Sequence, residues 1–172
     1  MDAQKGEAVV KELESDGGKA YFIKADSSKE EEIKITIERI VEKYDKLDIA
    51  YNNPGIGGEH NTTGNYDGKS WNSVVDLNLN GVFYDCKYEL QDVEKNGGGV
   101  IVNMASIHRV VAAPNSPAYT ATKHAVVRLI KNIGDEYAQK KIFAVIAWDQ
   151  LTLIHLYFSQ KRCLKPLRKS IL

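Results

Sequence analysis

Tyr119 and Lys123 are the pair of residues most able to do chemistry in this 172-residue sequence. They stand four positions apart near the start of a predicted helix, so both side chains lie on one helix face. An ammonium group beside a phenol stabilises the phenolate, and a tyrosine supported in this way can give or take a proton. Alone, such a pair is more often a half-exposed tyrosine above a solvated lysine.

Three further polar positions precede this pair in the chain. Asn52-Asn53-Pro54-Gly55 is a turn after a predicted strand, Asn78 lies in a predicted helix, and Ser106 follows the apolar run 100–104. In open α/β sheets ligands bind at the carboxyl ends of the strands, so the Ser106 hydroxyl could hold a substrate oxygen beside the tyrosine. Each position alone has an ordinary structural explanation. Their order, with 13 positions from Ser106 to Tyr119, favours a shared site.

Alternating strands and helices are predicted to carry these residues. Apolar spacing and turn residues predict helices over 2–16, 33–44, 70–95 and 116–140. Short apolar runs predict strands over 19–24, 47–51, 100–104 and 142–148. This alternation is typical of an α/β domain with a parallel sheet of about four strands.

Composition excludes several other classes of protein. The 23 basic and 23 acidic residues cancel, so no nucleic-acid partner is expected. No apolar run approaches the roughly 20 residues of a membrane span. The N-terminus has no apolar signal core and the two cysteines have no pairing pattern, which favours a cytoplasmic protein. The four histidines lack metal-ligand spacing, so no metal site is expected.

The four motifs together resemble those of the short-chain dehydrogenase/reductase family. They are Asn52-Asn53-Pro54-Gly55, Asn78-Leu79-Asn80-Gly81, the run from Ile101 to Ser106, and Tyr119-Thr120-Ala121-Thr122-Lys123. The resemblance covers about residues 2–142. It implies a partial Rossmann-like, doubly wound parallel sheet with flanking helices over residues 1–150. It also implies an oxidoreductase that moves a hydride between NAD or NADP and the carbon of an alcohol or ketone.

The resemblance assigns a role to each position. Tyr119 resembles the catalytic acid/base, Lys123 the lysine that makes it more acidic and binds the nicotinamide ribose, and Ser106 the residue that orients the substrate oxygen. Asn78 resembles the asparagine that completes a proton relay. For the cofactor, Asp26 with Ser27 resembles the adenine contact, and the stretch Asn52, Asn53, Pro54 and Gly55 resembles the lining of the adenosine half.

The sequence departs from the family pattern at its start. The family begins with a strand and a Gly-rich turn that binds the pyrophosphate, whereas this sequence opens in what would be the following helix. The choice between NAD and NADP is therefore unreadable. In the doubly wound order, two strands would lie between 19–24 and 47–51. We therefore expect strand 19–24 to be re-paired or detached and strand 47–51 to have an open edge.

The end of the chain also departs from the pattern. Residues 151–172 form a divergent basic tail, with Lys161, Arg162, Lys165, Arg168 and Lys169 and no acidic residue after Asp149. Such a tail can bind anionic surfaces or be poorly ordered. An alternative to the enzyme is an inactive fragment that acts as an interaction or dimerisation module. The helices 70–95 and 116–140 are the predicted contact of a homo-oligomer.

Overall fold

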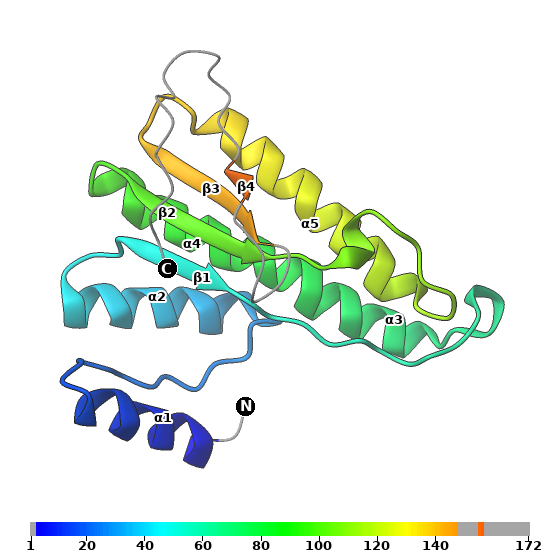
Figure 1. Cartoon of the computed structure of the whole chain (residues 1–172), viewed down its shortest axis with the longest axis horizontal. Coiled ribbons are helices and arrows are strands. Elements are labelled where there is room, and N and C mark those ends of the chain that lie inside the picture. Colours follow the sequence, from blue (N-terminus) through cyan, green and yellow to red (C-terminus); the bar gives the residue numbers. More distant parts are fainter. Residues whose placement is uncertain (1–2, 148–154, 157–172) are drawn as a thin grey trace.

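A small parallel sheet with helices packed on one face forms the centre of the molecule (Figure 1). The computed structural model describes residues 3–147 and 155–156. The parallel strands are β1 (Ile49–Asn52), β2 (Gly99–Met104) and β3 (Ile142–Ala147), and a short β4 (His155–Leu156) pairs antiparallel with β3. The sheet order is β1-β2-β3-β4, so β1 is an edge strand. The α/β class and the Rossmann-like arrangement are confirmed.

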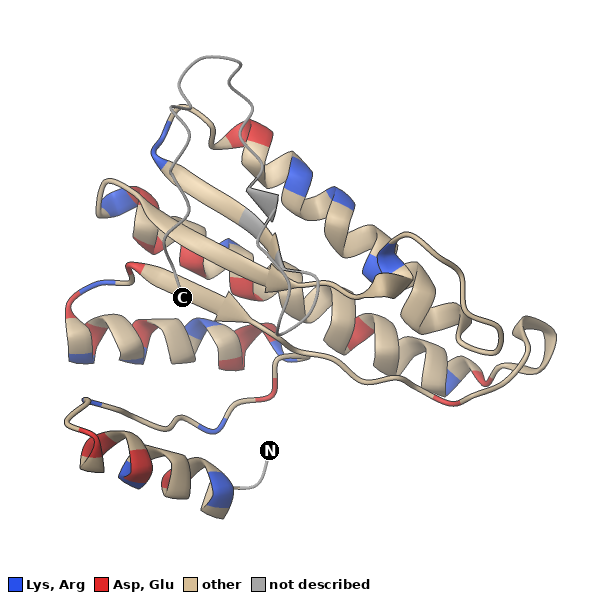
Figure 2. Ribbon diagram, in the orientation of Figure 1, with Lys and Arg blue, Asp and Glu red and all other residues tan. Residues whose placement is uncertain are grey.

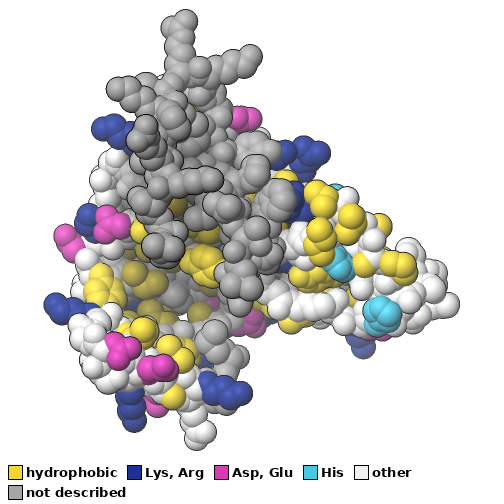
Figure 3. All heavy atoms as spheres, viewed as in Figure 1, with side chains coloured by type: hydrophobic (Ala, Val, Ile, Leu, Met, Phe, Trp, Pro, Cys, Tyr) yellow, Lys and Arg dark blue, Asp and Glu magenta, His cyan; other side chains and the backbone are white. Residues whose placement is uncertain are grey.

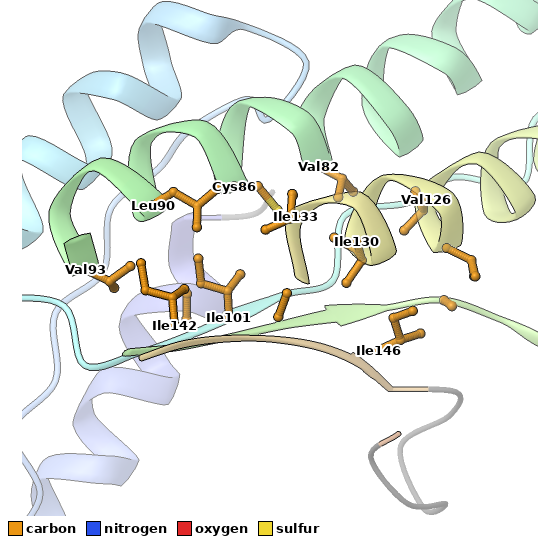
Figure 4. Close-up of a cluster of buried hydrophobic side chains, with 14 residues drawn as sticks. Val82, Cys86, Leu90, Val93, Ile101, Val126, Ile130, Ile133, Ile142 and Ile146 are labelled. Atoms are coloured by element: carbon orange, nitrogen blue, oxygen red, sulfur yellow. The ribbon is translucent and has the colours of Figure 1, made fainter. Parts of the chain in front are cut away.

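Helices α4 (Val82–Lys95) and α5 (Pro117–Glu136) bury their apolar faces against this sheet. On α4 the buried apolar residues follow helical spacing, and on α5 they include Val126, Ile130 and Ile133 (Figure 4). Ile101 of β2 and Ile146 of β3 meet them from the sheet. Burying one such side chain contributes about 1.5–3 kcal/mol, so this layer supplies most of the core.

The first two helices are attached more loosely. Helix α1 (Ala3–Ser15) buries none of its residues, and α2 (Glu30–Tyr44) buries only Ile33. An ion pair joins α2 to α4, in which Lys87 Nζ lies 2.6 Å from Glu30 Oε1, and Tyr88 donates to the same oxygen. Figure 2 shows that acidic and basic residues recur along the ribbons of α1, α2 and α5.

The prediction of a strand over residues 19–24 is wrong. This segment makes no strand, because no described strand lies beside it to pair with its backbone groups. It is held instead by side chains. The Phe22 ring packs directly on Gly6 of α1, and Lys43 Nζ lies 4.1 Å from the centroid of the Tyr21 ring. The segment is therefore detached from the sheet, and none of the described strands pairs with the outer edge of β1.

The predicted helix 70–95 is also interrupted. It consists of α3 (Gly68–Val75), a π-helical turn over Asp76–Gly81, and then α4. The predicted helices 2–16, 33–44 and 116–140 form with small shifts of their ends, as do the strands predicted over 47–51, 100–104 and 142–148. Apart from β4, the tail 151–172 lies outside the described residues. Among the described helices, none is long and apolar enough to cross a membrane.

Candidate active site

The first turns of α5 place Tyr119 and Lys123 against the carboxyl end of β2. Pro117 starts the helix, where its missing N–H costs nothing. Lys123 is only 2% exposed, and its Nζ lies 5.6 Å from the centroid of the Tyr119 ring. The same ammonium group donates a hydrogen bond of 3.2 Å to the carbonyl of Met104, the last residue of β2. Tyr119 and Lys123 therefore lie close together, and Lys123 is hydrogen-bonded to the sheet.

Asn78 fixes the loop that follows β1. It is fully buried in the π-helical turn, and its amide makes two hydrogen bonds to the backbone of Ile56. Oδ1 accepts from Ile56 N at 2.8 Å, and Nδ2 donates to Ile56 O at 2.9 Å. A Cβ built on the neighbouring Gly55 would lie 3.6 Å from Asn78 Oδ1 and 3.8 Å from Lys123 Nζ. Asn78, Gly55 and Lys123 thus surround one point.

Ser106 reaches the same region through a short helix. It caps the 3₁₀ helix Ile107–Arg109, where its Oγ accepts from the backbone N–H of His108 at 3.3 Å. The His108 ring packs edge-on against the Tyr119 ring, with the centroids 5.1 Å apart. His108 Nδ1 also lies 3.5 Å from Thr120 Oγ1. The turn from Ser106 to His108 is therefore held against the tyrosine.

The charge of Lys123 sits in an unusual environment. Burial lowers the pKa of its ammonium group below the ordinary value of 10.5, because the ion loses its hydration. The ammonium group contacts the Met104 carbonyl and the face of the Tyr119 ring. A negative charge that forms on the Tyr119 oxygen would favour the ammonium form, and the ammonium would favour that negative charge in return.

The residues predicted to bind the cofactor divide between two places. Gly55 lies beside Lys123, whereas Ser27, Asn52, Asn53 and Pro54 line a cleft of about 600 Å³ between β1 and residues 23–27. Asp26 is exposed next to Ser27. Its carboxylate accepts from the backbone and hydroxyl of Ser28, and these hydrogen bonds lower its pKa.

The side chain of Asn52 donates two hydrogen bonds inside this cleft. Its Nδ2 donates to Glu89 Oε2 at 2.9 Å and to Asn103 Oδ1 at 3.2 Å. These bonds tie the end of β1 to α4 and β2, so Asn52 steadies the sheet. Within the described part of the chain, no group of three or more His, Cys, Asp or Glu residues could hold a metal ion.

The sequence model of the short chain dehydrogenases matches residues 1–148. This chain belongs to the short-chain dehydrogenase family. It is 40% identical over 139 residues to the 3β-hydroxysteroid dehydrogenase of Mediterraneibacter gnavus, with 81% of this chain and 50% of that protein covered. It is 39% identical over 142 residues to the cyclohexanol dehydrogenase of an Acinetobacter species, with 83% and 57% covered. The chain thus spans about half the length of these relatives.

Solved structures of the family superpose on the same region. NAD⁺-bound xylitol dehydrogenase gives a TM-score of 0.82 at 25% identity, and covers 85% of this chain and 56% of its own. The protein ElxO with bound NADP gives 0.72 at 32% identity, with 74% and 52% covered. Both nicotinamide cofactors therefore occur among the structural neighbours of this short-chain dehydrogenase.

Three residues of this family member were missed by the sequence reasoning. The first is His108, whose ring packs on Tyr119. Its position two residues after Ser106 was the only feature of the sequence that could have placed it near the site. Asp85 and Glu89 lie on α4 and are 8% and 4% exposed. Burial raises the pKa of Asp85 to about 7 and that of Glu89 to about 8. Two carboxyl groups four positions apart among Val82, Cys86 and Leu90 were the signal for these two.

Proposed function

We propose that this chain carries the catalytic half of an NAD(P)-dependent oxidoreductase that acts on a secondary alcohol or its ketone. The observation that carries the proposal is the cluster of Tyr119, Lys123, Asn78 and Gly55 at the carboxyl ends of β1 and β2. Ligands of open α/β sheets bind at that edge. The four residues come from three segments that are far apart in the sequence. A chance match to one short motif therefore does not explain why they lie together.

In this proposal Tyr119 moves the proton of the reaction. During alcohol oxidation its oxygen, as phenolate, takes the proton of the substrate hydroxyl; during ketone reduction the phenol gives it back. The buried ammonium of Lys123 stabilises the phenolate, because the two charges attract strongly where water is excluded. Ser106 holds the substrate oxygen next to the phenol, and His108 keeps the ring from turning. Asn78 keeps the loop after β1 in place beside them.

In this proposal, Lys123 and Gly55 would hold the nicotinamide half of the cofactor. Lys123 has three N–H donors, and one of them is given to the Met104 carbonyl, so the ammonium group can also bind the hydroxyls of the nicotinamide ribose. Gly55 presents no side chain there, and a Cβ on Gly57 would meet nothing within 4 Å. When bound, the cofactor supplies or accepts the hydride. Among residues 3–147 and 155–156 no strand leads through a Gly-rich turn into a helix, which the pyrophosphate half needs.

The surroundings of Tyr119 favour an apolar, cyclic alcohol. Ile107, Val110 and Val111 expose their side chains on the segment between β2 and α5, where Figure 3 shows hydrophobic side chains gathered. The relatives named for hydroxysteroid and cyclohexanol substrates are consistent with this choice.

A cofactor titration and an alcohol assay test the proposal. Calorimetry with NADH and with NADPH should give a Kd below about 1 mM for one of them. Cyclohexanol oxidation should then be seen as formation of reduced nicotinamide. A chimera, in which the part of the Acinetobacter enzyme that precedes its matched region is joined before residue 1, supplies a pyrophosphate-binding loop as the positive control. If the chimera binds cofactor and turns over no alcohol, the proposal fails.

We also propose that the chain forms a homo-oligomer through α3, α4 and α5. Trp71 and Phe83 are 38% and 46% exposed on this helical layer, which is a high exposure for large aromatic side chains. Phe83→Lys should therefore lower the mass found by sedimentation from that of an oligomer to that of a monomer. A wild-type chain that sediments as a monomer at all concentrations would contradict this interface.

A further inference from the structure

The ring of His108 lies against the tyrosine of the proposed mechanism. Its centroid is 5.1 Å from that of the Tyr119 ring, and the two ring planes meet at 84°. The backbone N–H of His108 donates to the hydroxyl of Ser106 at 3.3 Å. The histidine is thus tied to both of the residues that would hold the reacting oxygen, and its ring borders the place of the substrate.

The two ring nitrogens of His108 have different surroundings. Nδ1 lies 3.5 Å from Oγ1 of Thr120, on the first turn of α5. Within residues 3–147 and 155–156, no group is hydrogen-bonded to Nε2, and this atom is not enclosed, so a ligand can reach it. In a neutral imidazole one nitrogen donates and the other accepts. A Thr120 hydroxyl that donates to Nδ1 leaves the ring proton on Nε2, as one N–H donor beside the site.

This N–H donor stands out because the neighbouring side chains are apolar. Ile107 and Val110, on either side of His108 in the chain, are 63% and 55% exposed. A substrate ring that packs on them removes water from the Nε2–H group, and a donor that loses water without gaining an acceptor weakens binding. The hydroxyls of Ser106 and Tyr119 take the reacting oxygen, so the acceptor for His108 has to be a second oxygen of the substrate.

We propose that His108 is a specificity-determining residue, whose Nε2–H binds a second oxygen on the carbon next to the reacting one. The substrate class is then a cyclic vicinal diol, or the α-hydroxyketone formed from it, because rings in contact serve oxygens on neighbouring carbons. The second oxygen keeps its proton and takes no part in the hydride or proton transfer. Thr120 is a positioning residue that holds the imidazole in the required tautomer. The inference rests on the proposed function, since it takes the space beside Ser106 and Tyr119 as the substrate site.

A matched pair of ligands tests this contact without cofactor and without turnover. In cis-1,2-cyclohexanediol the second hydroxyl is present, and in cis-2-methylcyclohexanol a methyl group of similar size replaces it. The dissociation constants of both for the full chain are measured by ligand-observed NMR. We expect the diol to bind about fivefold more tightly, from one added hydrogen bond. In a chain labelled with ¹³C at the histidine Cε1 atoms, the signal that His108→Leu removes should shift saturably with the diol.

Two matched pairs of variants assign the preference to the two side chains. His108→Leu has no N–H donor, whereas His108→Gln keeps one; Thr120→Val has no hydroxyl, whereas Thr120→Ser keeps it. We expect no preference for the diol in His108→Leu and less than about twofold in Thr120→Val. The Gln and Ser variants should keep a preference of at least about twofold. All four should show the circular dichroism of the wild type.

Equal dissociation constants of the two ligands for the wild type would overturn the proposal. So would a His108 signal that does not move at saturating diol, absence of saturable binding of the diol, or a preference that survives in His108→Leu. The proposed function fails through a different result, a chimera that binds cofactor and oxidises no alcohol. A chimera that oxidises cis-2-methylcyclohexanol as well as the diol would leave the oxidoreductase in place and remove the role of His108.

Discussion

Glu89 should make the stability of this protein depend on pH in an unusual direction. Its side chain is 4% exposed, and burial raises its pKa from the ordinary value of 4.5 to about 8. The folded state therefore binds a proton that the unfolded state has already released at neutral pH. Stability from this group is complete below pH 4.5 and is lost as the pH rises toward 8. At about 1.4 kcal/mol per pH unit, the loss is roughly 5 kcal/mol.

The variant Glu89→Gln removes this dependence and keeps an acceptor for Asn52. Its amide oxygen can take the hydrogen bond that Asn52 Nδ2 gives to the carboxylate. We expect Glu89→Gln to be within about 1 kcal/mol of the wild type at pH 5, where both side chains are neutral, and more stable by roughly 3–5 kcal/mol at pH 9. Urea unfolding followed by circular dichroism at several pH values measures the difference.

The control is Glu42→Gln, which removes a carboxylate from the exposed side of α2. We expect it to change the free energy of unfolding by less than about 0.5 kcal/mol throughout. The reasoning about Glu89 is refuted if Glu89→Gln differs from the wild type by the same amount at pH 5 and pH 9. It is equally refuted if the variant becomes relatively less stable as the pH rises.

Three other substitutions test the packing around the site. Ile130→Ala empties a position that is 0% exposed and should lower the free energy of unfolding by about 2–5 kcal/mol in urea titrations. Asn78→Ala removes both hydrogen bonds to Ile56, and should cost about 1–3 kcal/mol and speed hydrogen exchange at residues 55–57. Gly81→Val should loosen residues 26–28, because a Cβ there would lie 2.8 Å from the Ser27 carbonyl oxygen; unchanged proteolysis near residue 27 would contradict that contact.

Local patterns were enough to predict the central strands and the proximity of Tyr119 to Lys123. The apolar run 100–104 predicts a buried strand. The helical spacing of Val126, Ile130 and Ile133 predicts an apolar helix face that can cover it. The spacing of Tyr119 and Lys123 fixes their common helix face, whatever the rest of the chain does. These features depend on neighbours in sequence, so a single sequence reveals them.

Features that depend on distant partners were not predictable in the same way. Residues 19–24 have the composition of a strand, yet a strand needs a neighbour and no described strand lies beside them. The π-helical turn at Asp76–Gly81 has no local signature; it serves the contact of Asn78 with the backbone of Ile56, across 22 positions of sequence. The division of the predicted cofactor residues between Gly55 and the β1 cleft likewise follows from tertiary structure.

Comparison of the wild type with Tyr119→Phe in the cyclohexanol assay tests the central claim most directly. NADH or NADPH binding is measured by calorimetry in the same two proteins, since the substitution leaves the Lys123 ammonium group in place. The proposed mechanism predicts a kcat at least about 100-fold lower in Tyr119→Phe, with the cofactor Kd unchanged within about twofold. Equal turnover by the two proteins would contradict the role of Tyr119 as acid and base.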